Sequence, residues 1–142
     1  MHFETKAIHA GMRVENTTRD VVPPVHRSTV FELPEEGRSE GDLHYTRLGN
    51  PNRLQFERVL KELEEGAAAA AFSSGVAAAT AVLQSLRPGD HILIPDDVYK
   101  GNRMLVENVM KPWGLAADFI DMTDLENIKS HLTDKTALIW IE

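Results

Sequence analysis

The stretch "SSGVAAATAVLQSLRPGDHILIP", residues 73–95, places a helix-forming segment, a turn and an apolar run in that order along the chain. The first part predicts a helix with Ser74 or Ser73 as its N-cap, because a serine hydroxyl can accept a hydrogen bond from an amide of the first turn. The segment "RPGD" then ends the helix. The run "HILIP", residues 91–95, does not alternate between apolar and polar residues, which is typical of a strand buried on both faces.

The same alternation continues towards the C-terminus. Two more helices and two more strands follow: helices in residues 99–110 and 124–132, and strands within residues 113–121 and 136–141. Strands that alternate with helices indicate βαβ units, so we predict an α/β fold with a parallel sheet covered on both sides.

Upstream of this region, the segment "PNRLQFERVLKELEEG", residues 51–66, has apolar side chains on one helical face. We predict a helix that begins at Pro51 and stops at Gly66 in the left-handed conformation. The alanine run at residues 67–72 is ambiguous, because alanine favours helix. Its position between two turn signals leads us to predict a buried strand.

Composition limits the classes of function. Fifteen basic and 22 acidic residues give a formal charge of −7, which argues against nucleic acid or an anionic membrane as a partner. The chain has no cysteine, so a disulfide framework, a thiolate zinc site and a cysteine nucleophile are excluded. The six histidines lack metal-ligand spacing, and we expect no metal site. Without a signal core or an apolar span, the protein is expected to be soluble and cytoplasmic.

The first 50 residues lack sustained periodicity and are rich in proline and glycine. The segment "VVPPVHRSTVFELP", residues 21–34, is too apolar for a disordered tail, so we expect it to be ordered against a neighbour. At the other end, "TALIWIE" is a strand-like run with no turn after it, and we expect further residues to follow Glu142. The division expected is therefore residues 1–50 as an arm and residues 51–142 as part of an α/β domain.

Three loops carry candidate chemistry. Ser74, Gly75 and Val76 begin a helix, where free amides and the positive end of the helix dipole can hold a phosphate. An ordinary N-cap is the alternative for this motif, and by itself it is the more frequent one. Tyr45 and Arg47 would project to the same side of an extended segment, and a phenol beside a guanidinium suits phosphate oxygens. Their alternative is an exposed tyrosine and a solvated arginine.

The third loop follows the strand at residues 91–95 and contains Tyr99, whose ring could face a flat ligand. A lone tyrosine in a loop is more often structural, and Asp96 and Asp97 are expected to cap the next helix. His91 begins a buried strand, and we interpret it as a packed residue rather than a catalytic one.

Five segments in this order resemble the trans-sulfuration, or Cys/Met metabolism, family of pyridoxal-phosphate enzymes, which includes cystathionine γ-synthase and the cystathionine lyases. They are "TKAIHAG" (5–11), "PPVHRSTVFE" (23–32), "YTRLGNPN" (45–52), "FSSGVAA" (72–78) and "DDVYKGNRML" (96–105). The likeness implies an N-terminal arm followed by part of the large parallel or mixed-sheet domain of a fold-type I, aspartate aminotransferase-like enzyme. It also implies a cytoplasmic homotetramer, a dimer of dimers with active sites shared between subunits.

The resemblance also implies roles for particular residues. Tyr45 and Arg47 match the pair that binds the phosphate of pyridoxal 5′-phosphate (PLP) in the neighbouring subunit. Gly75 and Val76, with Ser74, match the segment whose amides hold the phosphate in the same subunit, although methionine is usual at the position of Val76. Tyr99 matches the tyrosine that stacks on the pyridine ring and takes part in proton transfer. Lys100 and Asn102 depart from the family's usual Y-G-G-T-x-R-L sequence.

The function implied for the intact protein is β- or γ-elimination or γ-replacement on sulfur amino acids or activated homoserine esters, of the cystathionine γ-synthase or γ-lyase type. The family's Schiff-base lysine and the aspartate that pairs with the pyridine nitrogen match no residue of this chain, so we expect these 142 residues alone to be inactive. The alternative is a stand-alone, non-catalytic phosphate-binding or assembly module.

Overall fold

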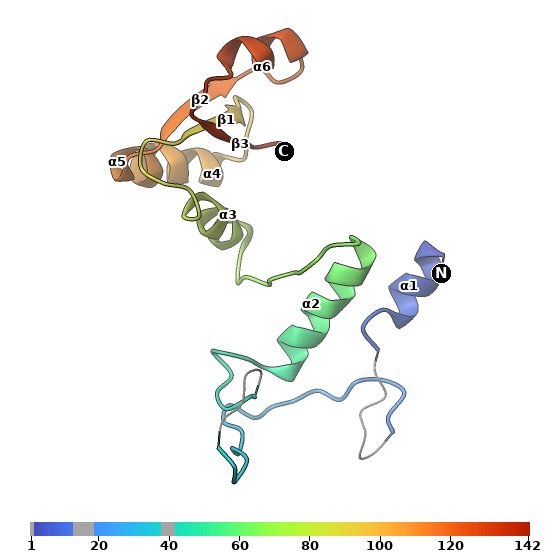
Figure 1. Cartoon of the computed structure of the whole chain (residues 1–142). Helices are drawn as coiled ribbons and strands as arrows, with labels where there is room; N and C mark the ends of the chain where they lie inside the picture. The colour runs from blue at the N-terminus through green and yellow to red at the C-terminus, as the bar shows by residue number, and fades with distance from the viewer. Residues whose placement is uncertain (1, 13–18, 38–41) are drawn as a thin grey trace. The chain divides into compact units, whose positions relative to one another are not determined.

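The computed structural model describes residues 2–12, 19–37 and 42–142, which belong to two compact units, residues 1–71 and 72–142 (Figure 1). Each unit is described by itself. The expected arm of residues 1–50 lies in the first unit, and residues 1, 13–18 and 38–41 of it are outside the described residues. The predicted boundary at residue 50 separates an interface arm from a cofactor-binding domain, and it stays a prediction.

The second unit is built on a three-stranded parallel sheet, as the sequence predicts. The order is β2–β1–β3, with β1 (His91–Pro95) between β2 (Ala116–Ile120) and β3 (Thr136–Ile139). All five residues of β1 are buried, because a central strand is covered by neighbours on both edges and by helices on both faces. This explains the uninterrupted apolar run of the central strand.

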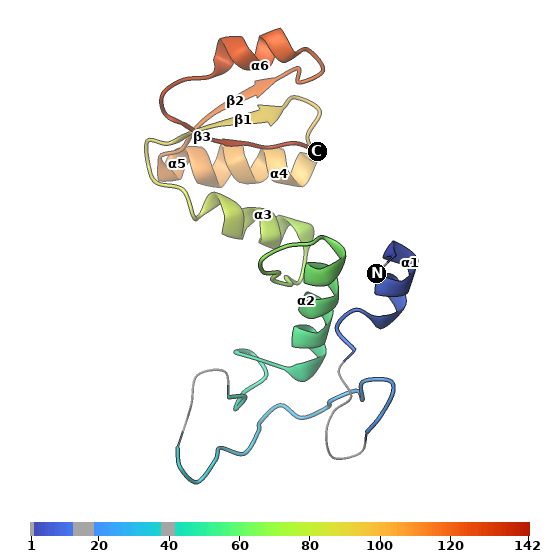
Figure 2. The ribbon, with the colours of Figure 1, turned by 45° about the vertical axis from the view of Figure 1, so that its right-hand side comes forward.

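Helices cover both faces of this sheet (Figure 2). Helix α6 (Leu125–His131) lies on one face, and on the other lies a continuous helical run. The run consists of α4 (Lys100–Leu105), a π-helical turn η1 (Val106–Met110) and α5 (Lys111–Trp113). It confirms the predicted helix and extends it by three residues to Trp113. Helix α3 (Gly75–Leu83) precedes β1, and Leu83 joins the core with Ile94, Val106 and Met110.

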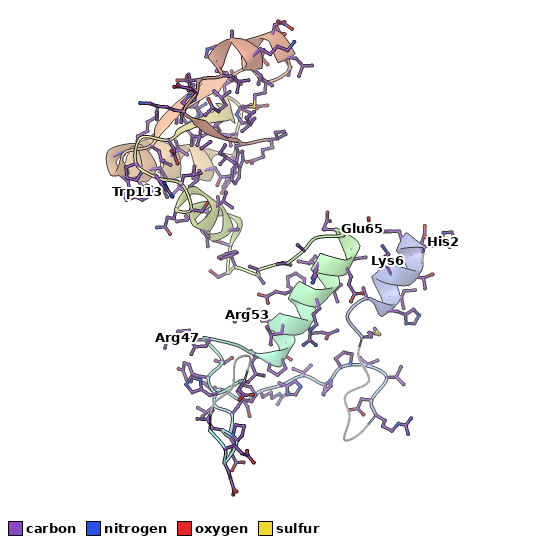
Figure 3. The ribbon with its side chains drawn as sticks, viewed as in Figure 1. His2, Lys6, Arg47, Arg53, Glu65 and Trp113 are labelled. Carbon is purple, nitrogen blue, oxygen red and sulfur yellow. The ribbon has the colours of Figure 1, made fainter. Side chains whose placement is uncertain are left out.

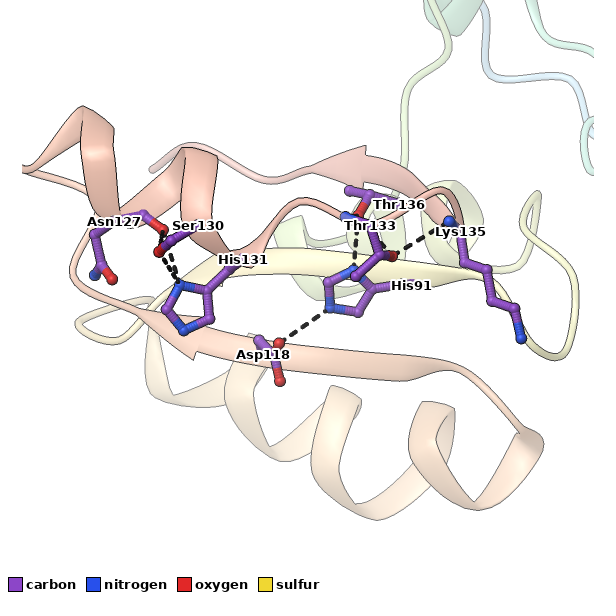
Figure 4. A network of polar contacts seen from close by, with 8 residues as sticks. All are labelled: His91, Asp118, Asn127, Ser130, His131, Thr133, Lys135 and Thr136. Atoms are coloured by element: carbon purple, nitrogen blue, oxygen red, sulfur yellow. Dashed lines mark hydrogen bonds and ion pairs between the residues drawn. The ribbon is translucent and has the colours of Figure 1, made fainter.

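A buried histidine links the three strands (Figure 4). His91, at the start of β1, is only 6% exposed. Its Nδ1 lies 2.8 Å from Thr136 Oγ1 on β3, and its Nε2 lies 3.3 Å from Asp118 Oδ2 on β2. Both ring nitrogens therefore have partners on the neighbouring strands, as a buried polar side chain requires. The interpretation of His91 as a packed residue is confirmed.

Replacing His91 by alanine is expected to lower the free energy of unfolding by about 2 kcal/mol, because it removes both cross-strand contacts and leaves a small cavity. Urea denaturation followed by circular dichroism measures this change. His131→Ala is the matched control, because the hydrogen-bond partners of the His131 ring among the described residues, Asn127 and Ser130, lie on its own helix. Equal stability of the two variants would contradict the structural role of His91.

The first unit contains two helices, α1 (Phe3–His9) and α2 (Pro51–Leu63). Helix α2 confirms the prediction at its start, where the Asn50 side chain accepts from the Asn52 amide and Pro51 is the first helical residue. Helix α1 was not predicted, since the arm was interpreted as irregular throughout. Its Lys6 Nζ lies 2.7 Å from Glu65 Oε1, just beyond the end of α2 (Figure 3).

The predicted end of α2 is wrong in detail. Glu65, with φ of 53°, takes the left-handed conformation that was assigned to Gly66. The last helical residue is Leu63 and the C-cap is Glu64, and the Glu65 carboxylate forms its ion pair with Lys6 just beyond this end. The same contact lowers the pKa of the Glu65 carboxyl.

The predicted strand at residues 67–72 is also wrong, since this segment has no ladder partner. Alanine buries too little apolar area to hold a strand by itself. The Ala71 amide instead donates to Glu57 Oε1 on α2, at 2.9 Å. Among the described residues, no helix is both long and apolar enough to cross a membrane.

Candidate functional site

A hollow of about 650 Å³ lies in the second unit at the end of the sheet where the parallel strands finish. It is lined by the start of α3, by Tyr99 in the loop after β1, and by the residues that follow β3. The structure thus brings the predicted residues Ser74, Gly75 and Val76 together with Tyr99. Ligands of α/β sheets bind at this edge, because the loops beyond the strands' carboxyl ends meet there.

The start of α3 serves as a capped helix and also leaves amides available. Ser74 is the N-cap, and its Oγ accepts from the Ala77 amide at 3.1 Å. The amides of Gly75 and Val76 have no partner within the helix, because the first turn lacks preceding carbonyls. In the described part of the chain, no other group accepts from them. An N-cap and a phosphate site are therefore compatible at this position. The cap uses the Ala77 amide and leaves the amides of Gly75 and Val76 available.

Replacing Ser74 by alanine is expected to destabilise the second unit by about 1 kcal/mol through loss of the cap. Thermal unfolding followed by far-ultraviolet circular dichroism measures the change. Ser73→Ala is the control, because Ser73 is the other serine that the sequence offered as the cap. A larger loss for Ser73→Ala than for Ser74→Ala would contradict the assignment.

The Tyr99 ring is 60% exposed and lies against a glycine that sequence reasoning missed. A Cβ on Gly101 would stand 2.5 Å from Tyr99 Cε1 and 3.1 Å from Val76 Cγ2. Only a glycine lets the ring approach the backbone this closely. The expected capping by Asp96 and Asp97 is wrong, because α4 begins at Tyr99 without a side-chain cap, and the Asp96 carbonyl accepts instead from Arg103.

Glu142 is a second residue of this hollow that the sequence did not indicate. Its Oε1 accepts from the Tyr99 amide at 3.1 Å, and its Oε2 accepts from Asn102 Nδ2 and Trp140 Nε1, each at 3.1 Å. The hydrogen bond from Trp140 is the main cause that lowers the pKa of Glu142, and those from Asn102 and Tyr99 add to it. The carboxylate therefore stays ionised while it connects the end of β3 to the start of α4.

Tyr45 and Arg47 lie in the first unit, in a turn and not in the extended segment that was predicted. The amides of Leu48 and Gly49 both donate to the Tyr45 carbonyl, which closes the turn. The two side chains still come together, with Arg47 Cζ 5.3 Å from the centre of the Tyr45 ring and Arg47 Nη2 3.5 Å from the Tyr45 hydroxyl. Tyr45 also forms an antiparallel bridge with Val30.

Arg53 on α2 supports this turn, and Figure 3 labels both Arg53 and Arg47. Its guanidinium donates to the Leu48 carbonyl at 2.8 Å and to the Arg47 carbonyl at 3.4 Å, and its Nε lies 3.6 Å from Glu57. Asn50 Nδ2 donates to Thr46 Oγ1 at 2.7 Å. These contacts fix the backbone of the turn and leave the Arg47 guanidinium exposed for a ligand. Sequence reasoning singled out Tyr45 and Arg47, and it did not indicate that Arg53 supports their turn.

Comparisons with known proteins all point to the same enzyme family. A family model described as Cys/Met metabolism PLP-dependent enzyme matches residues 4–142. The cystathionine gamma-synthase of Mycobacterium leprae is 42% identical over 139 residues, and the cystathionine beta-lyase of Coxiella burnetii is 38% identical over 142. The match covers 97% and 99% of this chain but 36% of each relative. The chain thus spans about a third of the length of these curated relatives.

Solved structures agree with this result. The metB structure from Corynebacterium glutamicum has a TM-score of 0.92 at 33% identity and covers 99% of this chain and 37% of its own. The cystathionine gamma-lyase from Lactobacillus plantarum, solved in complex with L-serine, has a TM-score of 0.88 at 34% identity, covering 98% and 36%. The resemblance and the α/β fold class derived from the sequence are confirmed.

Proposed function

The chain belongs to the family of Cys/Met metabolism PLP-dependent enzymes, and from this premise we propose that its described residues supply two halves of a PLP site. The observation that carries the proposal is the hollow of the second unit, which joins a helix N-terminus to an exposed aromatic ring. PLP has a dianionic phosphate and a flat ring. The free amides and the tyrosine face suit these two parts.

In the first half, the amides of Gly75 and Val76 donate to phosphate oxygens, and the positive end of the α3 dipole stabilises their charge. Ser74 positions these amides through its cap and can add its hydroxyl. Gly75 is exposed, and no heavy atom lies within 4 Å of the place where its Cβ would stand. The Tyr99 ring stacks on the pyridine ring of the cofactor.

In the second half, the Tyr45 hydroxyl and the Arg47 guanidinium bind the phosphate of a cofactor held by a neighbouring subunit. A guanidinium donates two parallel hydrogen bonds to a phosphate, which a single amide cannot do. This half therefore requires a homo-oligomer, and we propose a dimer of dimers in the cytoplasm with active sites shared between subunits.

For the intact protein we propose β- or γ-elimination or γ-replacement on sulfur amino acids or activated homoserine esters, of the cystathionine γ-synthase or γ-lyase type. Bound PLP supplies an electron sink for the negative charge that develops at the substrate's Cα. In this proposal the Tyr99 hydroxyl takes or returns a proton, and the Tyr99 ring would help to hold the cofactor in the hollow.

Fluorescence tests the binding step in the chain as it stands. Trp140 lines the hollow and Trp113 lies in α5, so a Trp113→Phe variant leaves one reporter next to the proposed site. Adding PLP is expected to quench Trp140 emission saturably, and inorganic phosphate is expected to compete with it. A folded variant whose emission PLP leaves unchanged would overturn the proposal.

A further inference from the structure

Glu142 makes an unusual set of contacts for an exposed carboxylate. It accepts three hydrogen bonds, from a backbone amide, a side-chain amide and an indole. Two of the donors, Tyr99 and Asn102, lie 40 or more residues earlier in the chain. A carboxylate with several N–H donors is held more firmly than one exposed to water alone, because hydrogen bonds to charged groups are the stronger ones.

These contacts fix the point at which the Tyr99 ring leaves the backbone. Helix α4 begins at Tyr99 without a side-chain cap of its own, so its first turn depends on a partner from elsewhere. Glu142 provides this partner from the end of β3, where its charge also suits the positive end of the helix. The Tyr99 ring also lies close against the backbone of Gly101.

We propose that Glu142 is a positioning residue, which holds the Tyr99 amide and the Asn102 side chain so that the Tyr99 ring stands at a fixed angle over the hollow. The inference rests on the proposed cofactor function, since the ring needs this angle only when a flat cofactor lies beneath it. Glu142 acts through Tyr99 and Asn102 in this proposal, because its three hydrogen bonds all come from protein donors.

The Asn102 amide supports this geometry. Its nitrogen donates to Glu142, while its Oδ1 is buried without a hydrogen-bond partner among the described residues. Within the described residues, Glu142 is thus the one hydrogen-bond partner of the Asn102 side chain, and a buried polar atom without a partner is costly. Removing the carboxylate would leave both atoms of this amide without partners and free the loop from Tyr99 to Asn102.

The test uses the full-length protein loaded with PLP. Glu142→Ala is expected to reduce by half or more the circular dichroism that the bound cofactor shows in its own absorption band, because this signal reports the fixed orientation of the ring. The value of kcat is expected to fall about tenfold with KM changed less than about threefold, since substrate binding is retained. Glu126→Ala is the matched control, because Glu126 pairs only with Lys129 on α6 and should leave both readouts unchanged.

The outcomes are distinguishable. A wild-type cofactor signal and wild-type kcat in Glu142→Ala would overturn the positioning role and leave the proposed function intact, whereas a wild-type protein that binds no PLP would overturn the proposed function itself. Glu142→Gln retains one acceptor oxygen for the Tyr99 amide, so its signal should lie between those of wild type and Glu142→Ala. If the alanine variant does not fold, a glutamine variant with the full wild-type signal overturns the inference, and a reduced signal supports it.

Discussion

Replacing Arg47 by alanine is expected to weaken PLP binding by the full-length protein about 100-fold, which is the largest effect we anticipate for a single side chain. The guanidinium offers a charged, paired hydrogen bond to the phosphate, and each hydrogen bond to a charged group contributes about 1.5–3 kcal/mol. Equilibrium dialysis against PLP measures the change.

Arg47→Lys tests whether the fork or only the charge is needed, and a loss of about tenfold is expected because lysine acts as a point charge. Arg87→Ala is the control, since Arg87 lies in the turn after α3 and its contact with Asp90 uses the backbone amide. If the Arg47→Ala protein binds PLP as tightly as the Arg87→Ala protein, Arg47 does not bind the phosphate.

Replacing Gly75 by alanine is expected to have opposite effects on stability and on binding. Gly75 is the first residue of α3 and does not have a positive φ, so alanine fits its backbone and should stabilise the fold by about 0.5 kcal/mol. The added methyl group would occupy open space beside the free amides. We therefore expect PLP to bind at least about tenfold more weakly, because the phosphate can no longer approach them.

Two measurements check this prediction, urea denaturation without ligand and equilibrium dialysis with PLP. Gly89→Ala makes a useful contrast, because Gly89 has a φ of 96° and alanine there is strained even though the space is open. That variant should lose stability and keep its PLP affinity. A Gly75→Ala protein that gains stability and also binds PLP normally would contradict the phosphate role of the α3 amides.

The two variants together test whether sites are shared between subunits. In a mixed oligomer, the Arg47→Ala subunit still supplies an intact Gly75, and the Gly75→Ala subunit still supplies an intact Arg47. Random mixing in equal amounts would restore about a quarter of the sites, because half of the dimers are mixed and each has one intact site. If no sites return on mixing, Arg47 and Gly75 act on the same subunit's cofactor.

Much of the second unit follows from local sequence. The apolar run of β1 determines a buried central strand, and the alternation with helices makes the sheet parallel. Ser74 before the glycine identifies the start of α3, and the apolar run before Tyr99 identifies the strand that its loop follows. These features depend on residues near one another in the chain, or on the general rule that parallel strands finish at one edge.

Other features depend on partners that local sequence does not reveal. The alanine run at residues 67–72 has the length of a strand, but it has no ladder partner in the structure, and its Ala71 amide donates instead to Glu57 on α2. Helix α2 ends at Leu63, and Glu65 rather than Gly66 takes the left-handed conformation, where its carboxylate pairs with Lys6, almost 60 residues earlier. A propensity describes what a residue prefers alone, and a distant partner can outweigh it.

By itself, the sequence determined the α/β class, the family resemblance and which side chains could hold a phosphate, since these depend on residue type and on periodicity along the chain. Only the tertiary structure decided how those side chains are supported, by Arg53 behind the turn of Arg47 and by Glu142 beside Tyr99. The physical reason is that a hydrogen bond between distant segments requires atoms to meet within about 3 Å. The register of β3 against β1, set by the packing of the whole sheet, carries the Glu142 carboxylate to the start of α4.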